Sequence, residues 1–347
     1  MASKAEGKGE LTNHTLATED GSTLSYYSIG KGPGLLILHG AASYALTQLE
    51  LAELLAGSYT VHLLSRRGRG LSGSYPKSVT ELEVVLPASD TGAESRMTIG
   101  GQQVQRTYNP IFTAGVLSTE LSDIELVIKA TQAPYILALS SSACLTLQAC
   151  ISRPDLFPAF HSTVKKIVLF EPPLVFEELE MGIDFKLLRA YENAMARGDV
   201  SGALIEAMRA VQLGPLWIPK VIMRVLTGLM IWMQNRKGKD KKKEEDKGKS
   251  TMGDMAPLLR YDFALAEHMV GSAKRFEDVA GDGERKVLLL SGDKSPGYVL
   301  EGMRELERVV KGAKRVVLEG VGHEVLCNSE MRGSPAMAVG ALKEFFG

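Results

Sequence analysis

The sequence predicts an α/β fold, in which a mostly parallel central sheet is flanked by helices and a helical cap is inserted between two strands. Short runs rich in leucine, isoleucine and valine recur along the chain, and such runs are typical of strands buried on both faces of a sheet. Patterns typical of amphipathic helices separate these runs. Polar residues follow the runs, at the strand ends where sites form in parallel sheets.

The expected elements follow one another in a regular order. A β-hairpin is expected first, with its two strands on either side of a turn, within residues 11–30. Buried strands are then expected at residues 35–38, 59–64, 135–139, 166–170, 287–290 and 315–318. Helices are expected at residues 46–55, from 117 onwards, after 140, at 299–310 and at 336–346. Residues 74–112 show no regular pattern and predict a long loop.

The same patterns divide the chain into three regions. The first is a flexible leader at residues 1–12. The second is a core of the α/β type in two pieces, 13–173 and 271–347, and the third is a helical cap at 174–270. Within the cap, Gly198 and Asp199 predict the end of one helix and the start of the next. A charged loop is expected at residues 235–250.

Composition excludes several classes of function. The net charge of −1 gives no overall attraction to nucleic acid. The three cysteines show no C-x-x-C spacing and the N-terminus has no apolar signal segment, so we expect a cytoplasmic protein without disulfides. The sequence contains no P-loop, no dinucleotide-binding fingerprint and no cluster with metal-ligand spacing. We therefore expect no cofactor, no metal ion and no nucleic-acid partner.

An apolar stretch at residues 216–233 is long enough to raise the question of a membrane span. Pro219, Lys220 and Arg224 interrupt it, and a mixed run of basic and acidic residues follows up to residue 249. We therefore expect a cap helix whose apolar face covers a pocket. The alternative is a weak peripheral membrane contact through residues 216–249.

Polar side chains gather at the ends of six expected strands, at His39, Ser65, Ser140, Glu171, Asp293 and His323. Because the carboxyl ends of parallel strands meet at one edge of a sheet, we expect these side chains to lie close together. Ser140 lies between a strand and a helix. At such a turn the serine hydroxyl is exposed, and the first backbone amides of the helix point at a group that the hydroxyl could attack. This arrangement predicts that Ser140 is a nucleophile.

Six segments at suitable spacings resemble the α/β-hydrolase superfamily, in the form that carries a helical cap. They are LLILHGAA, SRRGRGLSG, ILALSSSA, IVLFEPP, LLLSGDKSP and VVLEGVGH, in this order along the chain. The resemblance covers residues 20–347 and implies the fold and a serine hydrolase. It does not specify a substrate, because the fold supports many chemistries.

The resemblance implies that Ser140 occupies the serine of the G-x-S-x-G motif, with Ala138 and Ser142 at the glycine positions. Small residues are needed there because the turn is strained. Ser141 is rejected, since bulky Leu139 would then hold a small position, and Ser142 is a weaker alternative. His323 stands where the family carries the general base that accepts the serine proton.

The resemblance also implies an oxyanion hole, formed by the backbone amides of Ala41 and Ser141 after the His39-Gly40 turn. We expect the substrate pocket to involve His39, Leu139, Leu213 and Trp217.

The acid of the triad has two candidates. Most members carry an aspartate three residues after the glycine that ends the penultimate strand, but Ser295 stands there in this chain. Asp293 lies two residues earlier. Other members, such as haloalkane dehalogenases, place the acid after the strand that follows the nucleophile helix, and Glu171 occupies that place. We favour Glu171 over Asp293, which fits a turn residue.

Arg66, Arg67 and Arg69 lie in a turn that the family uses for structure. Three arginines so close together could bind an anion. We instead expect a solvated turn in which one of them forms an internal ion pair.

The sequence thus predicts a serine hydrolase that cleaves an ester, thioester or lactone of a small hydrophobic molecule through an acyl-enzyme. Two alternatives remain open. The first is another chemistry on the same fold, either hydrolysis of a C–C bond or a cyclisation or isomerisation in a biosynthetic pathway. The second is a non-catalytic protein that binds a small ligand, which the substituted motif positions would permit.

Overall fold

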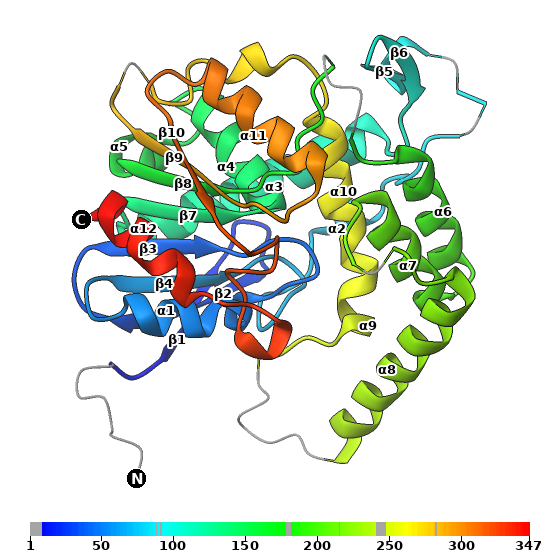
Figure 1. The fold of residues 1–347 in the computed structure, drawn as a ribbon, viewed down its shortest axis with the longest axis horizontal. Coiled ribbons are helices and arrows are strands. Elements are labelled where there is room, and N and C mark those ends of the chain that lie inside the picture. The colour runs from blue at the N-terminus through cyan, green and yellow to red at the C-terminus, as the bar shows by residue number, and fades with distance from the viewer. Residues whose placement is uncertain are drawn as a thin grey trace.

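The computed structural model describes residues 9–87, 89–90, 92–177, 182–214, 216–240, 248–281 and 283–347. Its main sheet has the strand order β1-β2-β4-β3-β7-β8-β9-β10 (Figure 1). The first two strands form the predicted antiparallel hairpin, and β2 also pairs antiparallel with β4. The remaining pairs, which join β4, β3, β7, β8, β9 and β10, are parallel. The strands are β1 (Thr12–Ala17), β2 (Thr23–Gly30), β3 (Gly34–Leu38), β4 (Thr60–Ser65), β7 (Tyr135–Leu139), β8 (Lys166–Phe170), β9 (Lys286–Gly292) and β10 (Lys314–Leu318). The predicted α/β fold class is confirmed.

Helices cover both faces of this sheet, and alternate residues of each central strand contact opposite layers. In β3, Leu36 and Leu38 join one hydrophobic cluster, whereas Leu35 and Ile37 join the other. The first cluster contains the buried faces of α3 (Pro110–Thr131), α4 (Ser141–Ile151) and α11 (Gly297–Val309). The second contains those of α1 (Leu49–Leu55) and α12 (Ala336–Phe346). A two-sided apolar environment therefore explains the continuous apolar runs in the sequence.

A helical segment, residues 174–285, connects β8 to β9. It contains α6 (Phe185–Ala196), α7 (Val200–Ala210), α8 (Lys220–Asp240), α9 (Met252–Met255) and α10 (Leu259–His268). The predicted break between α6 and α7 is confirmed, because Gly198 has a φ of 72° and the Asp199 side chain accepts a hydrogen bond from the Gly202 amide. Figure 1 shows these helices on one side of the sheet, with α8 extending along the outer edge of the molecule.

The predicted long loop at residues 74–112 is wrong. This stretch contains α2 (Lys77–Thr80) and a second hairpin of β5 (Arg96–Ile99) and β6 (Gln102–Gln105). Gly100 and Gly101 form its turn with φ of 54° and 73°, as the common two-residue hairpin turn requires. Next, α3 begins at Pro110 and not at Leu117, because Asn109 caps the helix by accepting a hydrogen bond from the Ile111 amide.

Two further findings concern a helix that was not predicted and two predicted segments that lie largely outside the described residues. The chain also forms α5 (Pro158–Thr163), a helix between α4 and β8 that the sequence patterns did not predict. Most of the predicted leader and the centre of the predicted charged loop, residues 1–8 and 241–247, lie outside the described residues. Across the described ranges, no helix is long and apolar enough to cross a membrane.

Candidate active site

Ser140 forms a strained turn between β7 and α4. Its backbone has φ 52° and ψ −119°, a region that L-residues seldom adopt, and its N–H donates to the carbonyl of Phe170 on β8 at 2.8 Å. The end of β3 approaches this turn closely, since a Cβ added at Gly40 would lie 2.9 Å from the Cβ of Ser140. The absence of a side chain at Gly40 therefore permits this close approach.

His323 and Glu171 come together from the ends of two strands. Glu171 directly follows β8, has a φ of 48° and is fully buried. Its Oε2 lies 2.5 Å from Nδ1 of His323, which follows β10. Because a carboxylate accepts hydrogen bonds, Nδ1–H is the donor in this contact, which leaves Nε2 as the ring nitrogen that can accept a hydrogen bond.

The second oxygen of Glu171 is held by β9 and the loop after it. Oε1 accepts hydrogen bonds from the Gly292 amide at 2.7 Å and from the Ser295 hydroxyl at 2.6 Å. Asp293, the other candidate acid, instead accepts a hydrogen bond from the Gly320 amide at 2.8 Å. The structure thus brings Glu171 to His323 and gives Asp293 a role in a turn.

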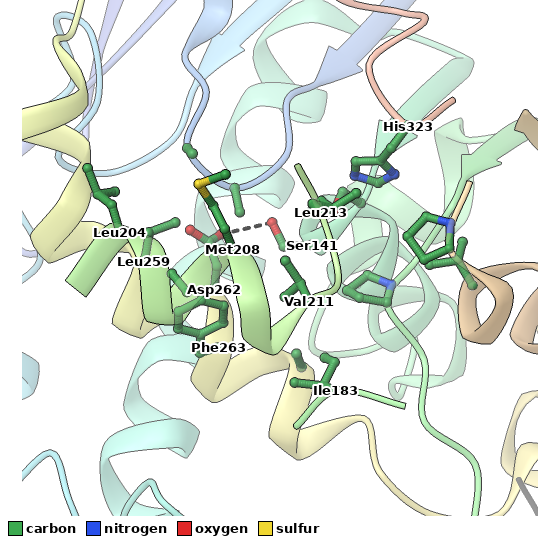
Figure 2. Close-up of a pocket in the computed structure, with 18 of the residues that line it drawn as sticks. Ser141, Ile183, Leu204, Met208, Val211, Leu213, Leu259, Asp262, Phe263 and His323 are labelled. Atoms are coloured by element: carbon green, nitrogen blue, oxygen red, sulfur yellow. Dashed lines mark hydrogen bonds between the residues drawn. The ribbon is translucent and has the colours of Figure 1, made fainter. Parts of the chain in front are cut away.

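An apolar cavity of about 170 Å³ opens at Ser140 and His323 (Figure 2). Its apolar walls come mainly from α7, α10 and the chain next to them, through Ile183, Leu204, Met208, Val211, Leu213, Leu259 and Phe263. A second cavity of about 250 Å³ also reaches Ser140 and His323, and Leu139 and Phe170 contribute to its lining. Ser140 and His323 therefore lie where the two cavities meet.

Of the four residues predicted to form the pocket, two line a cavity and two do not. Leu213 lines both cavities and Leu139 lines the second one. The predictions for His39 and Trp217 are wrong. Trp217 lies before α8 and is 85% exposed. The apolar side of α8 likewise faces solvent instead of the pocket.

His39 is buried behind the cavities and has a structural role. Its Nε2 accepts a hydrogen bond from the Arg66 amide at 3.1 Å, and its Nδ1 donates to the Gly40 carbonyl at 2.8 Å. Burial, together with the charges of Arg69 and Arg66, holds the pKa of His39 well below its ordinary value. The imidazole is therefore neutral and connects the ends of β3 and β4.

Ala41 and Ser141, the two residues whose amides are expected to form an oxyanion hole, lie next to Ser140 in the cavity lining. Ser141 is the first residue of α4, so its N–H has no acceptor within the helix, and Ala41 follows β3. Both residues line the apolar cavity with Ser140. The hydroxyls of the neighbouring serines are held by internal bonds, from Ser141 to Asp262 at 2.8 Å and from Ser142 to the His39 carbonyl at 2.5 Å.

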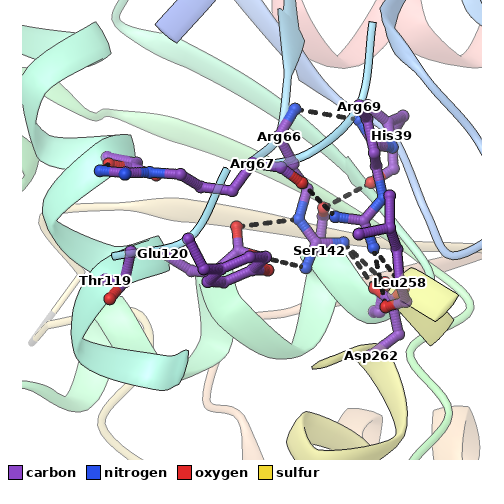
Figure 3. A network of polar contacts seen from close by, with 12 residues as sticks. His39, Arg66, Arg67, Arg69, Thr119, Glu120, Ser142, Leu258 and Asp262 are labelled. Atoms are coloured by element: carbon purple, nitrogen blue, oxygen red, sulfur yellow. Dashed lines mark hydrogen bonds and ion pairs between the residues drawn. The ribbon is translucent and has the colours of Figure 1, made fainter. Parts of the chain in front are cut away.

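The three arginines after β4 form a buried ion-pair network with carboxylates of other elements (Figure 3). Arg66 forms a bidentate pair with Glu120 of α3, at 2.6 and 3.0 Å, and contacts Asp262 of α10 at 2.8 Å. Arg69 pairs with the other oxygen of Asp262 at 2.5 Å. Arg67 pairs with Asp123 and Asp20. The predicted solvated turn is therefore wrong, because all three arginines are buried and paired.

This network connects the helical segment to the turn that carries Ser140. The Ser141 hydroxyl donates to Asp262 and accepts from Arg66 at 3.0 Å, so three chain segments meet at one side chain. Burial alone would raise the pKa of Asp262, but the charges of Arg69 and Arg66 outweigh it and hold that pKa below its ordinary value. Asp262 is thus a buried carboxylate anion at the edge of the apolar cavity.

Sequence reasoning missed both acidic partners of Arg66. Glu120 lies one helical turn from Val116 and Ile124, which are buried on α3, so its position on an apolar face was the available signal. Asp262 gave less indication, since it lies in a helix nearly two hundred residues along the chain from Arg66. In the part of the chain that the structure describes, no group of histidine, cysteine or acidic residues could hold a metal ion.

Comparisons with known proteins place this geometry in context. No protein-family model matches the chain. The chain is similar to an alpha/beta hydrolase from Sphaerobacter thermophilus, with 22% identity, a TM-score of 0.63, and 96% of this chain and 100% of that chain covered. An esterase from Exiguobacterium antarcticum gives 15% identity, a TM-score of 0.57, and coverage of 96% and 100%. The thioesterase domain from the curacin biosynthetic pathway gives 18%, 0.56, and coverage of 97% and 100%.

Proposed function

We propose that this chain, which has the α/β-hydrolase fold, is a serine hydrolase that cleaves an ester, thioester or lactone of a small hydrophobic molecule. One observation carries the proposal. The buried carboxylate of Glu171 holds Nδ1 of His323 at 2.5 Å, while His323 and the strained Ser140 line the same two cavities. A nucleophile, a base and a group that orients the base are the parts that acyl transfer requires.

In the proposed reaction, the Ser140 hydroxyl attacks the substrate carbonyl and gives its proton to Nε2 of His323. The amides of Ala41 and Ser141 stabilise the negative oxygen of the tetrahedral intermediate. His323 then protonates the leaving alcohol or thiol, and an acyl-enzyme remains. Water, deprotonated by His323, attacks this ester and releases the acid, which restores Ser140. Glu171 stabilises the imidazolium that forms twice in the cycle.

The lining of the cavity supports a small hydrophobic acyl group. A buried apolar cavity of about 150 Å³ holds a molecule the size of benzene, and the cavity at Ser140 measures about 170 Å³. We propose that it holds the acyl part, and that the second cavity, of about 250 Å³, holds the leaving group. In this proposal the helical segment is the cap, because α7, α10 and the chain next to them supply most of the apolar wall.

A fluorophosphonate probe tests the proposal, because it phosphonylates only an activated serine. We expect one equivalent of label on Ser140 and a loss of both labelling and esterase activity, by at least about 10³-fold, in Ser140→Ala. The control is Ser142→Ala, which removes the other candidate hydroxyl and should keep the label on Ser140. Labelling that persists in Ser140→Ala would contradict the assignment. A folded protein that takes no label and cleaves no ester would indicate a binding protein instead.

A further inference from the structure

A continuous apolar surface lies on the outer side of α8 and the residues before it. Of the sixteen large hydrophobic side chains that are exposed in the described chain, nine fall within residues 216–233. We call these nine the α8 surface: Leu216, Trp217, Val221, Ile222, Val225, Leu226, Leu229, Trp232 and Met233. Single exposed apolar residues are ordinary, but a contiguous apolar patch of this kind marks a contact surface.

The contacts of α8 with α7 fix this orientation. Met223 is buried on the inner side, and the two basic residues near the start of α8 pair with acidic residues of the α7 region. Lys220 pairs with Glu206, and Arg224 pairs with Asp199 at 2.7 Å. Charged side chains thus hold the helix to its neighbour while the apolar side faces solvent. This is the reverse of the usual arrangement of a surface helix, whose apolar stripe faces the core.

The residue types on this surface favour a lipid interface. Both tryptophans of the chain lie there, one before α8 and one near its C-terminal half, and tryptophan is enriched where proteins meet the headgroup region of a bilayer. The guanidinium of Arg236 stacks on the Trp232 ring at 4.4 Å. From Arg236 onwards, the sequence up to residue 249 has eight basic and four acidic side chains, so the segment that follows this surface along the sequence carries an excess of positive charge.

We propose that the α8 surface binds the face of an anionic lipid bilayer, with α8 lying parallel to the membrane. The apolar side chains would enter the boundary between headgroups and acyl chains, and the adjoining basic residues would contact anionic headgroups. A second copy of the chain would bring the same positive charge against itself, whereas an anionic bilayer attracts it. This proposal does not depend on the catalytic one, because it concerns residues outside both cavities.

The two native tryptophans provide a direct test, since both lie on this surface and tryptophan emission, excited selectively over that of tyrosine, therefore reports on it alone. With vesicles of phosphatidylcholine containing about a third phosphatidylserine, we expect the emission to move to shorter wavelength and the protein to sediment with the vesicles. Vesicles of phosphatidylcholine alone should bind at least about tenfold more weakly, and added salt should weaken binding to the anionic vesicles.

A pair of double variants separates this surface from general hydrophobicity. Val225→Glu with Leu229→Glu keeps both tryptophans and should lower vesicle binding by at least about tenfold. Ile111→Glu with Leu156→Glu makes the same charge change at two other exposed residues and should leave binding unchanged. Circular dichroism and the thermal midpoint of unfolding establish that both proteins are folded.

Three outcomes would overturn the proposal. Native protein that binds neither type of vesicle would exclude the membrane surface, and equal binding to both types would exclude anionic lipid as the partner. A native dimer in sedimentation equilibrium without lipid, which dissociates in the Val225→Glu and Leu229→Glu variant, would assign the α8 surface to a second copy of the chain.

Discussion

Glu171→Gln tests the proposed triad most directly. The wild-type carboxylate accepts a hydrogen bond from Nδ1–H of His323 through Oε2, while Oε1 accepts from Gly292 and Ser295. Glutamine keeps the size of the side chain and one acceptor oxygen, which Gly292 and Ser295 can still bind. Its amide NH₂ then faces His323 and can only donate. The imidazole must therefore move its proton to Nε2, and this tautomer cannot accept the proton of Ser140.

The size of the effect follows from this change of tautomer. The same carboxylate-to-amide change in a serine protease triad lowers kcat by about 10⁴, which corresponds to about 5 kcal/mol of transition-state stabilisation. We expect a loss of about 10³ to 10⁴ in kcat for Glu171→Gln. KM should change little, because Glu171 lines neither cavity.

The assay is the hydrolysis of a short p-nitrophenyl ester, followed by the release of nitrophenol. Asp293→Asn is the matched control, since it makes the same chemical change at the other candidate acid, which bonds to the Gly320 amide. It should keep kcat within about twofold. Wild-type kcat in a folded Glu171→Gln protein would refute the reasoning, and so would a loss in Asp293→Asn as large as that in Glu171→Gln.

Other substitutions test the contacts around the triad. Gly40→Ala would place a Cβ 2.9 Å from that of Ser140, and we expect kcat to fall at least about tenfold while the protein stays folded. Asp262→Asn leaves Arg69 without its carboxylate partner, so the free energy of unfolding in urea should fall by about 3–5 kcal/mol. Burial raises the pKa of Glu267 from 4.5 to about 7. Because this pKa is higher in the folded state, stability should decline by up to about 3 kcal/mol as pH rises from 4.5 to 7, and less so in Glu267→Gln.

The parallel sheet could be predicted because the residues of each strand show by themselves that both faces of the strand are buried. The run LLIL of β3 is apolar throughout, since its alternate residues enter two different clusters. The meeting of Glu171 with His323 could also be anticipated, because Pro172 and Pro173 end β8 directly after the acid and hold it at the sheet edge. In both cases a few neighbouring residues carry the information.

The features that were missed depend on contacts between distant segments. Nothing next to Arg66 in the sequence shows that Glu120 and Asp262 will surround it, which is why the sequence alone predicts a solvated turn. For the same reason, the sequence alone predicts that the apolar residues of α8 cover the pocket. Their pattern shows an apolar face, but the direction of that face depends on contacts with other helices, such as the pairs of Lys220 with Glu206 and of Arg224 with Asp199.

The contact between Glu171 and Ser295 makes one more prediction about the position of the acid. The Ser295 hydroxyl, at the place where the resemblance implies an aspartate, lies 2.6 Å from the carboxylate that holds His323. A carboxylate introduced by Ser295→Asp would therefore lie close to the position of the carboxylate that Glu171→Gln removes. We expect the double variant to recover at least about tenfold of the kcat lost in Glu171→Gln, whereas Ser295→Ala in the same background should recover none. A folded double variant without recovery would mean that the end of β8 alone can orient His323. Recovery would mean that either strand end can do so, because both converge on the same ring nitrogen.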